Sequence, residues 1–338
     1  MKKIVLLLLL AAFFLAACLP GPTTKTGSKA ITVYAFSIMK ESLETDIYPA
    51  FAAKWKQEHG EDITFNSSFA GSETVTNQIL QGAPADIAIL SIELDVQRLM
   101  KAGFVSQDWF ATPQRGIVNK TPFVILVRAG NPLGIKDFAD LGKPGVKLIH
   151  PDPVSSGGAQ WSILSIYGSE LKKSEAETGT ADPTRALNTL KAVWANVIST
   201  PGSAREARTQ FETGYGDALI TYELEGLLMQ QAKLPVEIVV PKATIFSEHP
   251  GVVIERNVAA DERDVVNAFR NFLWSEEAQK AFVKNNFRSS TNDALNEGNA
   301  HFVKIEMPFT VHYFGGWEKA SPDIIEGIFR DKVKDAKK

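Results

Sequence analysis

Short apolar runs alternate along this chain with longer segments in which apolar residues recur at helical spacing. The first run, Ile31–Phe36, has the length and composition of a buried strand, and the segment after it repeats an apolar residue every four positions from Leu43 to Trp55. Such a repeat lines one face of a helix. Further strands are expected at 62–65 and 86–90, each followed by a helix. Strands that alternate with helices of this length predict a parallel, doubly wound sheet.

A second series of strands and helices starts at the uniformly apolar run 123–127. Its further strands are expected at 147–150, 197–199, 218–222 and 236–240. The remainder of the chain is mainly helical by its apolar spacing. Two such series predict two lobes, because a single hydrophobic core rarely grows to about 300 residues.

The predicted fold class is α/β, with two doubly wound lobes joined by a hinge that the chain crosses twice. We expect lobe one to comprise residues 30–114 and 246–338, and lobe two to comprise residues 117–243. A ligand in such a fold binds beyond the carboxyl ends of the strands, in the cleft between the lobes.

The first residues have the pattern of an export signal. Two lysines precede the apolar run Ile4–Leu15, which is shorter than the roughly 20 residues that span a membrane. The run ends at Leu-Ala-Ala-Cys18, which resembles a bacterial lipobox and contains the only cysteine of the chain. We interpret 1–17 as a lipoprotein signal peptide, Cys18 as the lipidated residue and 18–29 as a tether. The alternative is an ordinary signal peptide with an incidental cysteine.

The charge of the chain excludes one class of partner. The formal net charge is −3, and removal of 1–17 takes away two lysines and leaves −5. A net-negative protein is a poor candidate for binding nucleic acid. If the protein binds an anion, local geometry must therefore prevail over the overall charge.

Three turns rich in glycine or serine fall where a predicted strand gives way to a predicted helix, at 70–72, 155–159 and 202–204. The N–H groups of a first helical turn lack partners within the helix and carry about half a positive charge. Glycine lets the backbone approach an anion, and serine adds a hydroxyl donor. For any one serine a helix N-cap is the commoner role. Three such turns in both halves of the chain together predict one oxyanion site.

The segment from Asn131 to Trp161 contains the runs Asn-Pro, Gly-Ile-Lys-Asp, Lys-Pro-Gly-Val-Lys, Pro-Asp-Pro and Ser-Ser-Gly-Gly-Ala-Gln-Trp. These runs, with 84–86 and 214–223, closely resemble the periplasmic sulfate- and thiosulfate-binding proteins of ABC transporters. The resemblance extends from about Ile31 past Phe246. It implies the type II periplasmic-binding-protein fold, in which hinge closure encloses the ligand.

The resemblance also implies the residues of the site. The Ser-Gly-Gly cradle of the family falls on Ser156, its first serine turn falls on Ser72, and its alanine amide falls on Ala204. Tyr222 stands where the family has a tryptophan donor, and Ser37 stands in place of an aspartate. The anion-binding candidates are Ser37, Ser72, Ser156, Gly157, Gly158, Ser203, Ala204 and Tyr222.

Two charged residues flank these positions. Glu73 replaces a family glycine, and its carboxylate either favours the helix dipole or accepts a hydrogen bond from a protonated oxygen, which would favour phosphate over sulfate. Arg205 is interpreted as half of an ion pair at the rim, with Glu206 or Glu223, and alternatively as a contact of the anion. Both residues are therefore placed just outside the shell of uncharged donors.

These observations predict a binding protein and not an enzyme. The five histidines have no metal-ligand spacing and no nucleophile elbow is visible, so neither a metal nor a cofactor is expected. The expected partners are sulfate or a related oxyanion, an ABC permease, and the membrane through a lipid anchor; we expect a monomer in the periplasm or on the outer face of the cell membrane. Thiosulfate, molybdate, tungstate and phosphate stay open as alternative ligands. An extracytoplasmic sulfatase or phosphatase, and a sensor that docks on a receptor kinase, also stay open.

Overall fold

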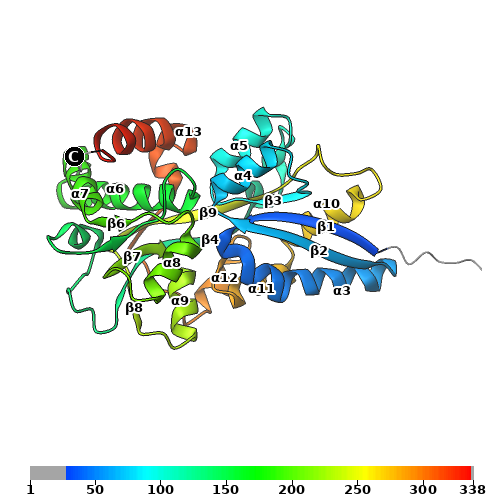
Figure 1. Ribbon diagram of the computed structural model, residues 1–338, viewed down its shortest axis with the longest axis horizontal. Coiled ribbons are helices and arrows are strands. Elements are labelled where there is room, and N and C mark those ends of the chain that lie inside the picture. Colours follow the sequence, from blue (N-terminus) through cyan, green and yellow to red (C-terminus); the bar gives the residue numbers. More distant parts are fainter. Residues whose placement is uncertain (1–27, 336–338) are drawn as a thin grey trace, which may run out of the picture.

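The computed structural model of the protein describes residues 28–335. The expected signal peptide, the lipidation site Cys18 and most of the expected tether lie outside the described residues. The chain forms two α/β parts that lie side by side along the long axis of the molecule (Figure 1). Between residues 28 and 335, no helix combines the length and the apolar character needed to cross a membrane.

The strands are β1 (Ser28–Phe36), β2 (Asp62–Ala70), β3 (Ile87–Ile89), β4 (Ile117–Arg128), β5 (Leu148–Ile149), β6 (Val197–Ser199), β7 (Ala218–Tyr222), β8 (Val236–Val239), β9 (Ala243–Val253), β10 (Arg288–Ser289) and β11 (Met307–Phe309). β1 to β8 each overlap a predicted apolar run, whereas β9, β10 and β11 were not predicted as strands. β1 begins two residues before the expected start of lobe one.

The helices fill the intervals between the strands. They are α2 (Lys40–Ser42), α3 (Tyr48–His59), α4 (Ser72–Leu80), α5 (Glu93–Lys101), α6 (Gly157–Thr178), α7 (Pro183–Ala195), α8 (Ala204–Glu212), α9 (Glu223–Gln231), α10 (Arg263–Phe272), α11 (Glu276–Lys284), α12 (Asp293–Glu297) and α13 (Trp317–Ala320). Short 3-10 or π segments are η1 (Ser37–Met39), η2 (Leu43–Ile47), η3 (Trp109–Ala111), η4 (Pro113–Gly116), η5 (Phe138–Gly142), η6 (Val311–Phe314) and η7 (Ser321–Arg330).

Two long strands carry the chain between the two parts of the sheet. The strand order is β2-β1-β3-β9-β4-β7-β5-β6, with parallel pairing at one end among β1, β2 and β3, and at the other among β5, β6 and β7. β4 runs antiparallel to β9 over its first half and antiparallel to β7 over its second half. The predicted α/β class, with two doubly wound lobes and two crossing strands, is confirmed.

β9 was not predicted as a strand, because four of its residues are polar. Three of them are fully buried: the Thr244 hydroxyl donates to the Phe123 carbonyl at 2.7 Å, and the Ser247 hydroxyl donates to the Thr121 carbonyl at 2.7 Å. The His249 ring N–H donates to the Asn119 side-chain oxygen at 2.6 Å. The partners all come from β4, more than a hundred residues away, so a local pattern of apolar residues does not reveal this strand.

The C-terminal segment packs on the helices of lobe two, although we expected all of 246–338 in lobe one. Trp317 packs edge-on against Trp161 of α6, with ring centroids 4.7 Å apart, and Phe329 does the same against Trp194 of α7 at 4.6 Å. Trp161 and Trp194 are both buried. Figure 1 shows α13 and the chain end beside α6 and α7. The C-terminal segment therefore covers apolar side chains of α6 and α7 that face away from the sheet.

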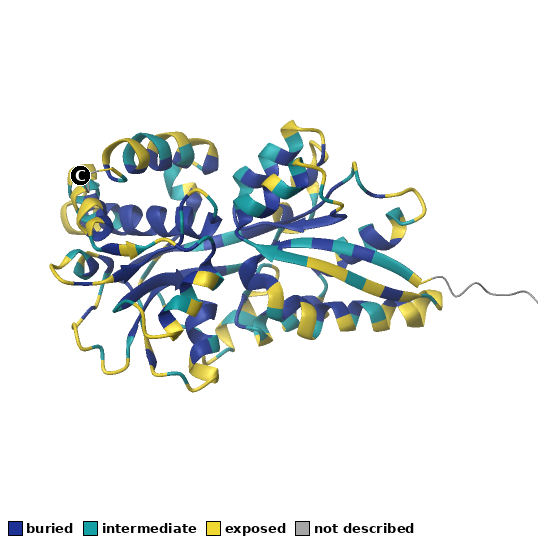
Figure 2. Ribbon diagram, viewed as in Figure 1, coloured by how far each residue is buried: buried dark blue, intermediate teal, exposed yellow. Residues whose placement is uncertain are grey.

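An aromatic cluster holds the N-terminal and returning parts of lobe one together. Tyr48 of α3 stacks on Phe65 of β2 with ring centroids 4.0 Å apart. Phe269 of α10 lies 5.1 Å from Phe51 and 4.9 Å from Phe65, and it is fully buried. Figure 2 shows buried residues on the strands and on parts of the helices of both lobes. The cluster therefore joins segments that the crossing strands separate in sequence.

Truncation of Phe269 to alanine should destabilise lobe one. Loss of a fully buried ring leaves a cavity and is expected to lower the free energy of unfolding by about 3–5 kcal/mol. Urea denaturation followed by tryptophan fluorescence measures the change. Phe110→Ala is the matched control because this ring is 49% exposed, and its effect should stay within about 0.5 kcal/mol. Equal effects of the two changes would refute the role of the cluster.

Candidate functional site

The first turns of several helices meet where the two parts of the sheet adjoin. α4 begins at Ser72 directly after β2, and α8 and α9 begin at Ala204 and Glu223 after β6 and β7. α6 begins at Gly157, and η1 begins at Ser37 after β1. In Figure 1 these helix starts point to the junction crossed by β4 and β9. Unpartnered backbone N–H groups from both lobes are therefore directed to a common region.

The two lobes touch across this region. A β-carbon placed on Gly71 would lie 2.2 Å from the Ser155 carbonyl oxygen and 2.6 Å from the Gly202 carbonyl oxygen. Gly71 has an ordinary φ of −60°, so glycine is required here for space and not for its backbone conformation. The three turns at 70–72, 155–159 and 202–204 thus lie against one another, and the cleft is closed.

Ser91 lies at the centre of the cleft and was missed at the sequence level. Its hydroxyl is 2.8 Å from the Tyr222 hydroxyl, and its carbonyl accepts from the Trp161 ring N–H at 2.7 Å. A β-carbon on Gly157 would lie 2.8 Å from the Ser91 β-carbon. The signal was available, because Ser91 follows the predicted strand 86–90 directly and precedes a helix, as the other serines do.

Several buried hydroxyls in the cleft keep a proton that can be donated. Ser156 stands at the N-cap of α6 but makes no side-chain cap bond, and it is only 2% exposed. Burial raises the pKa of Tyr222, so the phenol stays protonated. Because Tyr222 and Ser91 bond to each other, one of their two protons remains for another acceptor. Gly158 packs against Tyr222: a β-carbon placed on Gly158 would lie 2.8 Å from the Tyr222 hydroxyl oxygen.

Two other predicted donors are engaged within the protein. The Ser203 side chain caps α8 by accepting from the Glu206 N–H at 3.2 Å, which is the ordinary N-cap role. The Ser72 hydroxyl oxygen accepts from the Ser91 N–H at 2.9 Å and lies 2.5 Å from a carboxylate oxygen of Asp95. Ala204 follows Ser203 in the first turn and contributes its backbone N–H.

Arg205 forms an ion pair, but with other partners than expected. Its guanidinium bridges the lobes to Glu41 and also donates to Glu225 at 3.0 Å. The expected partners are occupied elsewhere, since Glu223 binds Arg288 and Glu206 accepts from the Gly202 N–H. Distance in sequence explains the miss, because Glu41 is 164 positions from Arg205.

These contacts also determine the charge state of Glu41. Burial alone would raise the pKa of Glu41, but the hydrogen bonds and the charge of Arg205 outweigh burial and hold this pKa below its usual value. Glu41 therefore stays ionised at neutral pH and keeps its attraction to Arg205 across the cleft.

Glu73 lies in the first turn of α4 and also reaches across the cleft. It accepts from Arg98 at 2.5 Å and from the Gln160 side chain of lobe two at 3.2 Å. Burial raises the pKa of Glu73 even though the charge of Arg98 opposes this shift. Its carboxylate oxygens are thus occupied by Arg98 and Gln160 at the side of the cleft.

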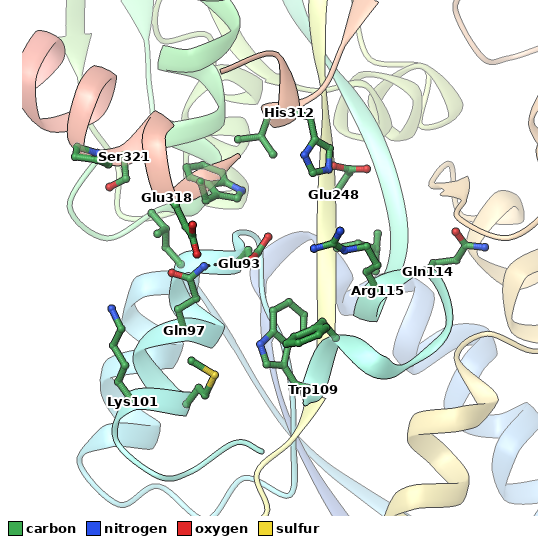
Figure 3. A pocket seen from close by; sticks show the side chains of 17 residues that line it. Glu93, Gln97, Lys101, Trp109, Gln114, Arg115, Glu248, His312, Glu318 and Ser321 are labelled. Carbon is green, nitrogen blue, oxygen red and sulfur yellow. Dashed lines mark hydrogen bonds between the residues drawn. The ribbon is translucent and has the colours of Figure 1, made fainter. Parts of the chain in front are cut away.

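A separate pocket of about 750 Å³ opens beside the cleft, between α5, β9 and the C-terminal segment (Figure 3). Its wall carries both signs of charge, from Glu93, Glu248 and Arg115, next to the ring of Trp109. It contains none of the predicted anion-binding residues. In the part of the chain from 28 to 335, no group of three His, Cys, Asp or Glu side chains is arranged to hold a metal ion.

Two α/β lobes, two crossing strands and uncharged donors facing each other in a closed cleft define a solute-binding protein. The family model "Bacterial extracellular solute-binding protein" matches residues 31–288. The chain therefore belongs to this family.

Relatives within the family are similar over most of the chain. The sulfate-binding protein of Synechococcus elongatus is 33% identical over 95% of this chain and 92% of its own length. The thiosulfate-binding protein of Escherichia coli is 33% identical over 83% of this chain and 82% of its own length. The structure of the sulfate-binding protein SubI from Mycobacterium tuberculosis superimposes with a TM-score of 0.79 at 31% identity, covering 87% of this chain and 99% of that chain. The resemblance to sulfate- and thiosulfate-binding proteins is confirmed.

Gly71→Ala should prevent closure of the cleft without unfolding either lobe. The added methyl group would overlap carbonyl oxygens of Ser155 and Gly202 that are part of the backbone, so the lobes must separate. Small-angle X-ray scattering should show a larger radius of gyration than for the wild type. Gly298→Ala is the control. Gly298 also has a negative φ, and a β-carbon placed on it would have one near neighbour, the Ala294 carbonyl oxygen of α12 at 3.2 Å. A compact Gly71→Ala protein would contradict the closed geometry.

Proposed function

We propose that this protein is an extracytoplasmic lipoprotein that captures sulfate in the cleft between its lobes and delivers it to an ABC importer. The observation that carries the proposal is the convergence of uncharged donors from the starts of α4, α6, α8 and α9. The similarity to sulfate-binding and thiosulfate-binding proteins supports the same ligand class. Nothing covalent happens to the ligand, and the protein acts as a monomer.

The chemistry of the ligand follows from the donors. Sulfate carries no proton at neutral pH, so each of its oxygens only accepts hydrogen bonds. The proposed shell consists of the backbone N–H groups of Gly157, Gly158 and Ala204 with the hydroxyls of Ser156 and Tyr222, and all of these donate. Ser37, Ser72 and Ser203 complete the set, with Ser91 added from the geometry. The carboxylate of Glu73 is occupied by Arg98 and Gln160, which argues against its use as an acceptor for a protonated phosphate.

The alternative within the same class is another tetrahedral oxyanion, thiosulfate, molybdate, tungstate or phosphate, because the same donors serve all of them. The alternative from another class is a sulfatase or phosphatase. Sustained product release from an aryl sulfate or aryl phosphate would support that alternative.

Delivery to the importer requires export and retention at the membrane, which we assign to 1–17 and to lipidation of Cys18. Mass spectrometry of the mature N-terminus tests whether Cys18 carries a lipid.

Titration calorimetry with sodium sulfate tests the proposed function. Wild-type protein should release heat with sulfate, and Ser156→Leu should release none, because a leucine side chain fills the space in front of the α6 amides. Val154→Leu is the control, since Val154 is 58% exposed two residues earlier in the same turn. The same titration with thiosulfate, molybdate and phosphate identifies the ligand. Strong binding of phosphate without binding of sulfate, or unchanged affinity in Ser156→Leu, would contradict the proposal.

Glu41→Gln should speed release of the anion. The substitution keeps the shape of the side chain but removes the charge that attracts Arg205 across the closed cleft, so the open form becomes more populated. We expect about a tenfold weaker affinity, mostly through a faster dissociation rate. Stopped-flow tryptophan fluorescence measures this rate. Glu58→Gln is the control, because its pair with Lys54 lies within α3 on the surface. An unchanged dissociation rate in Glu41→Gln would show that the ion pair does not hold the lobes together.

A further inference from the structure

A buried carboxyl group lies directly behind one of the proposed anion donors. Asp95, in the first turn of α5, is fully buried, and its Oδ2 atom lies 2.5 Å from the Ser72 hydroxyl oxygen. Its other oxygen, Oδ1, makes no hydrogen bond within the described residues. Neither the sequence pattern nor the proposed function assigns a role to this group.

The hydrogen bonds of Ser72 depend on whether Asp95 carries a proton. The Ser72 oxygen already accepts from the Ser91 N–H at 2.9 Å. A hydroxyl has one proton to donate and can accept two hydrogen bonds. If Asp95 is ionised, it takes the only proton of Ser72, and none is left for an anion. If Asp95 is protonated, it donates to Ser72, and the Ser72 proton is free.

Burial and the charge of Glu73 favour the protonated form of Asp95, and the charge of Arg98 opposes it. Glu73 faces it from α4 with a like charge, and Arg98 faces it from α5 at 3.7 Å. Arg98 is already engaged by Glu73 at 2.5 Å and by Asn77 at 2.6 Å, so it stays beyond hydrogen-bond distance of Asp95. Burial, followed by the charge of Glu73, raises the pKa of Asp95 to about 8.

We propose, on the basis of the proposed anion-binding function, that Asp95 is a positioning residue which holds a proton, donates it to the Ser72 hydroxyl and thereby turns that hydroxyl toward the bound oxyanion. When the pH is near or above the pKa of Asp95, binding of the anion is therefore coupled to uptake of a proton by this group. A neutral Asp95 also avoids the repulsion that an ionised carboxylate directly behind Ser72 would exert on a bound dianion. An uncharged carboxyl group thus completes a shell in which every partner of the anion donates.

The coupling determines the direction of the pH dependence. The anion binds more tightly to the protein in which Asp95 is protonated. The affinity for the anion is therefore highest below the pKa that Asp95 has in the anion-free protein, and it falls as the pH rises above that pKa. With that pKa at about 8, affinity at pH 9.5 should be about 30-fold lower than at pH 6.5. Sulfate does not titrate in this range, so the change reports on the protein.

The test is calorimetry with sodium sulfate from pH 6 to pH 9.5, in pairs of buffers that differ in ionisation enthalpy. The wild type should take up close to one proton per sulfate at pH 9. Asp95→Asn should bind within about threefold of the wild type at pH 6.5, because the amide N–H donates to Ser72 as the neutral acid does. It should keep that affinity to pH 9.5 and take up no proton.

The control is Asp86→Asn. Asp86 is another buried carboxyl group of lobe one whose pKa burial raises, but it accepts from the Thr32 N–H, away from the cleft. This variant should retain the wild-type pH dependence. Infrared spectra of wild-type protein labelled with 13C-aspartate give a second measurement, which needs no variant: a protonated aspartic acid band should persist at pH 7 and disappear above pH 9.

The outcomes separate this inference from the proposed function. If sulfate does not bind at pH 6.5, the proposed function fails. If sulfate binds without uptake of a proton, or if Asp95→Asn keeps the wild-type pH dependence, only the role of Asp95 fails. A folded Asp95→Asn protein that has lost more than tenfold in affinity at pH 6.5 would also overturn it.

Discussion

Backbone N–H groups at the start of a helix have no partner inside that helix, and this fold brings several such starts to one cleft. The arrangement depends on parallel strands in both lobes, because the carboxyl ends of β1, β2 and β3 then face those of β5, β6 and β7. The antiparallel pair β4 and β9 connects the two series. Polar groups that would be costly to bury alone are thereby directed to one region between the lobes.

Charge is kept out of the centre of the cleft and placed at its sides. The centre contains glycines, serines and Tyr222, whereas the ion pair of Arg205 with Glu41 and the contact of Glu73 with Gln160 lie on either side of it. Both contacts join lobe one to lobe two and exist only while the lobes are together. In the proposed function, the groups that hold the lobes together therefore do not compete for the anion. The proposed neutral form of Asp95 fits this pattern, because an ionised carboxylate beside Ser72 would place a negative charge behind the uncharged donors.

The sequence predicted the elements whose signals are local and missed those that depend on distant partners. The alternation of strands and helices, the serine and glycine turns and the resemblance to sulfate- and thiosulfate-binding proteins were all visible in short segments. β9 was hidden because Thr244, Ser247 and His249 find their partners on β4. The partner of Arg205 and the packing of the C-terminal segment on lobe two were unpredictable for the same reason. Ser91 is the exception, since it had the same local signal as the other serines and was overlooked.

The most direct measurement of the central claim is a crystal structure with bound selenate, which has the shape and charge of sulfate and scatters anomalously. One strong anomalous peak is expected between the starts of α4, α6, α8 and α9. The oxygens around it should lie within hydrogen-bond distance of the N–H groups of Gly157, Gly158 and Ala204. Absence of a peak there at saturating selenate, with peaks confined to surface lysines and arginines, would contradict the account.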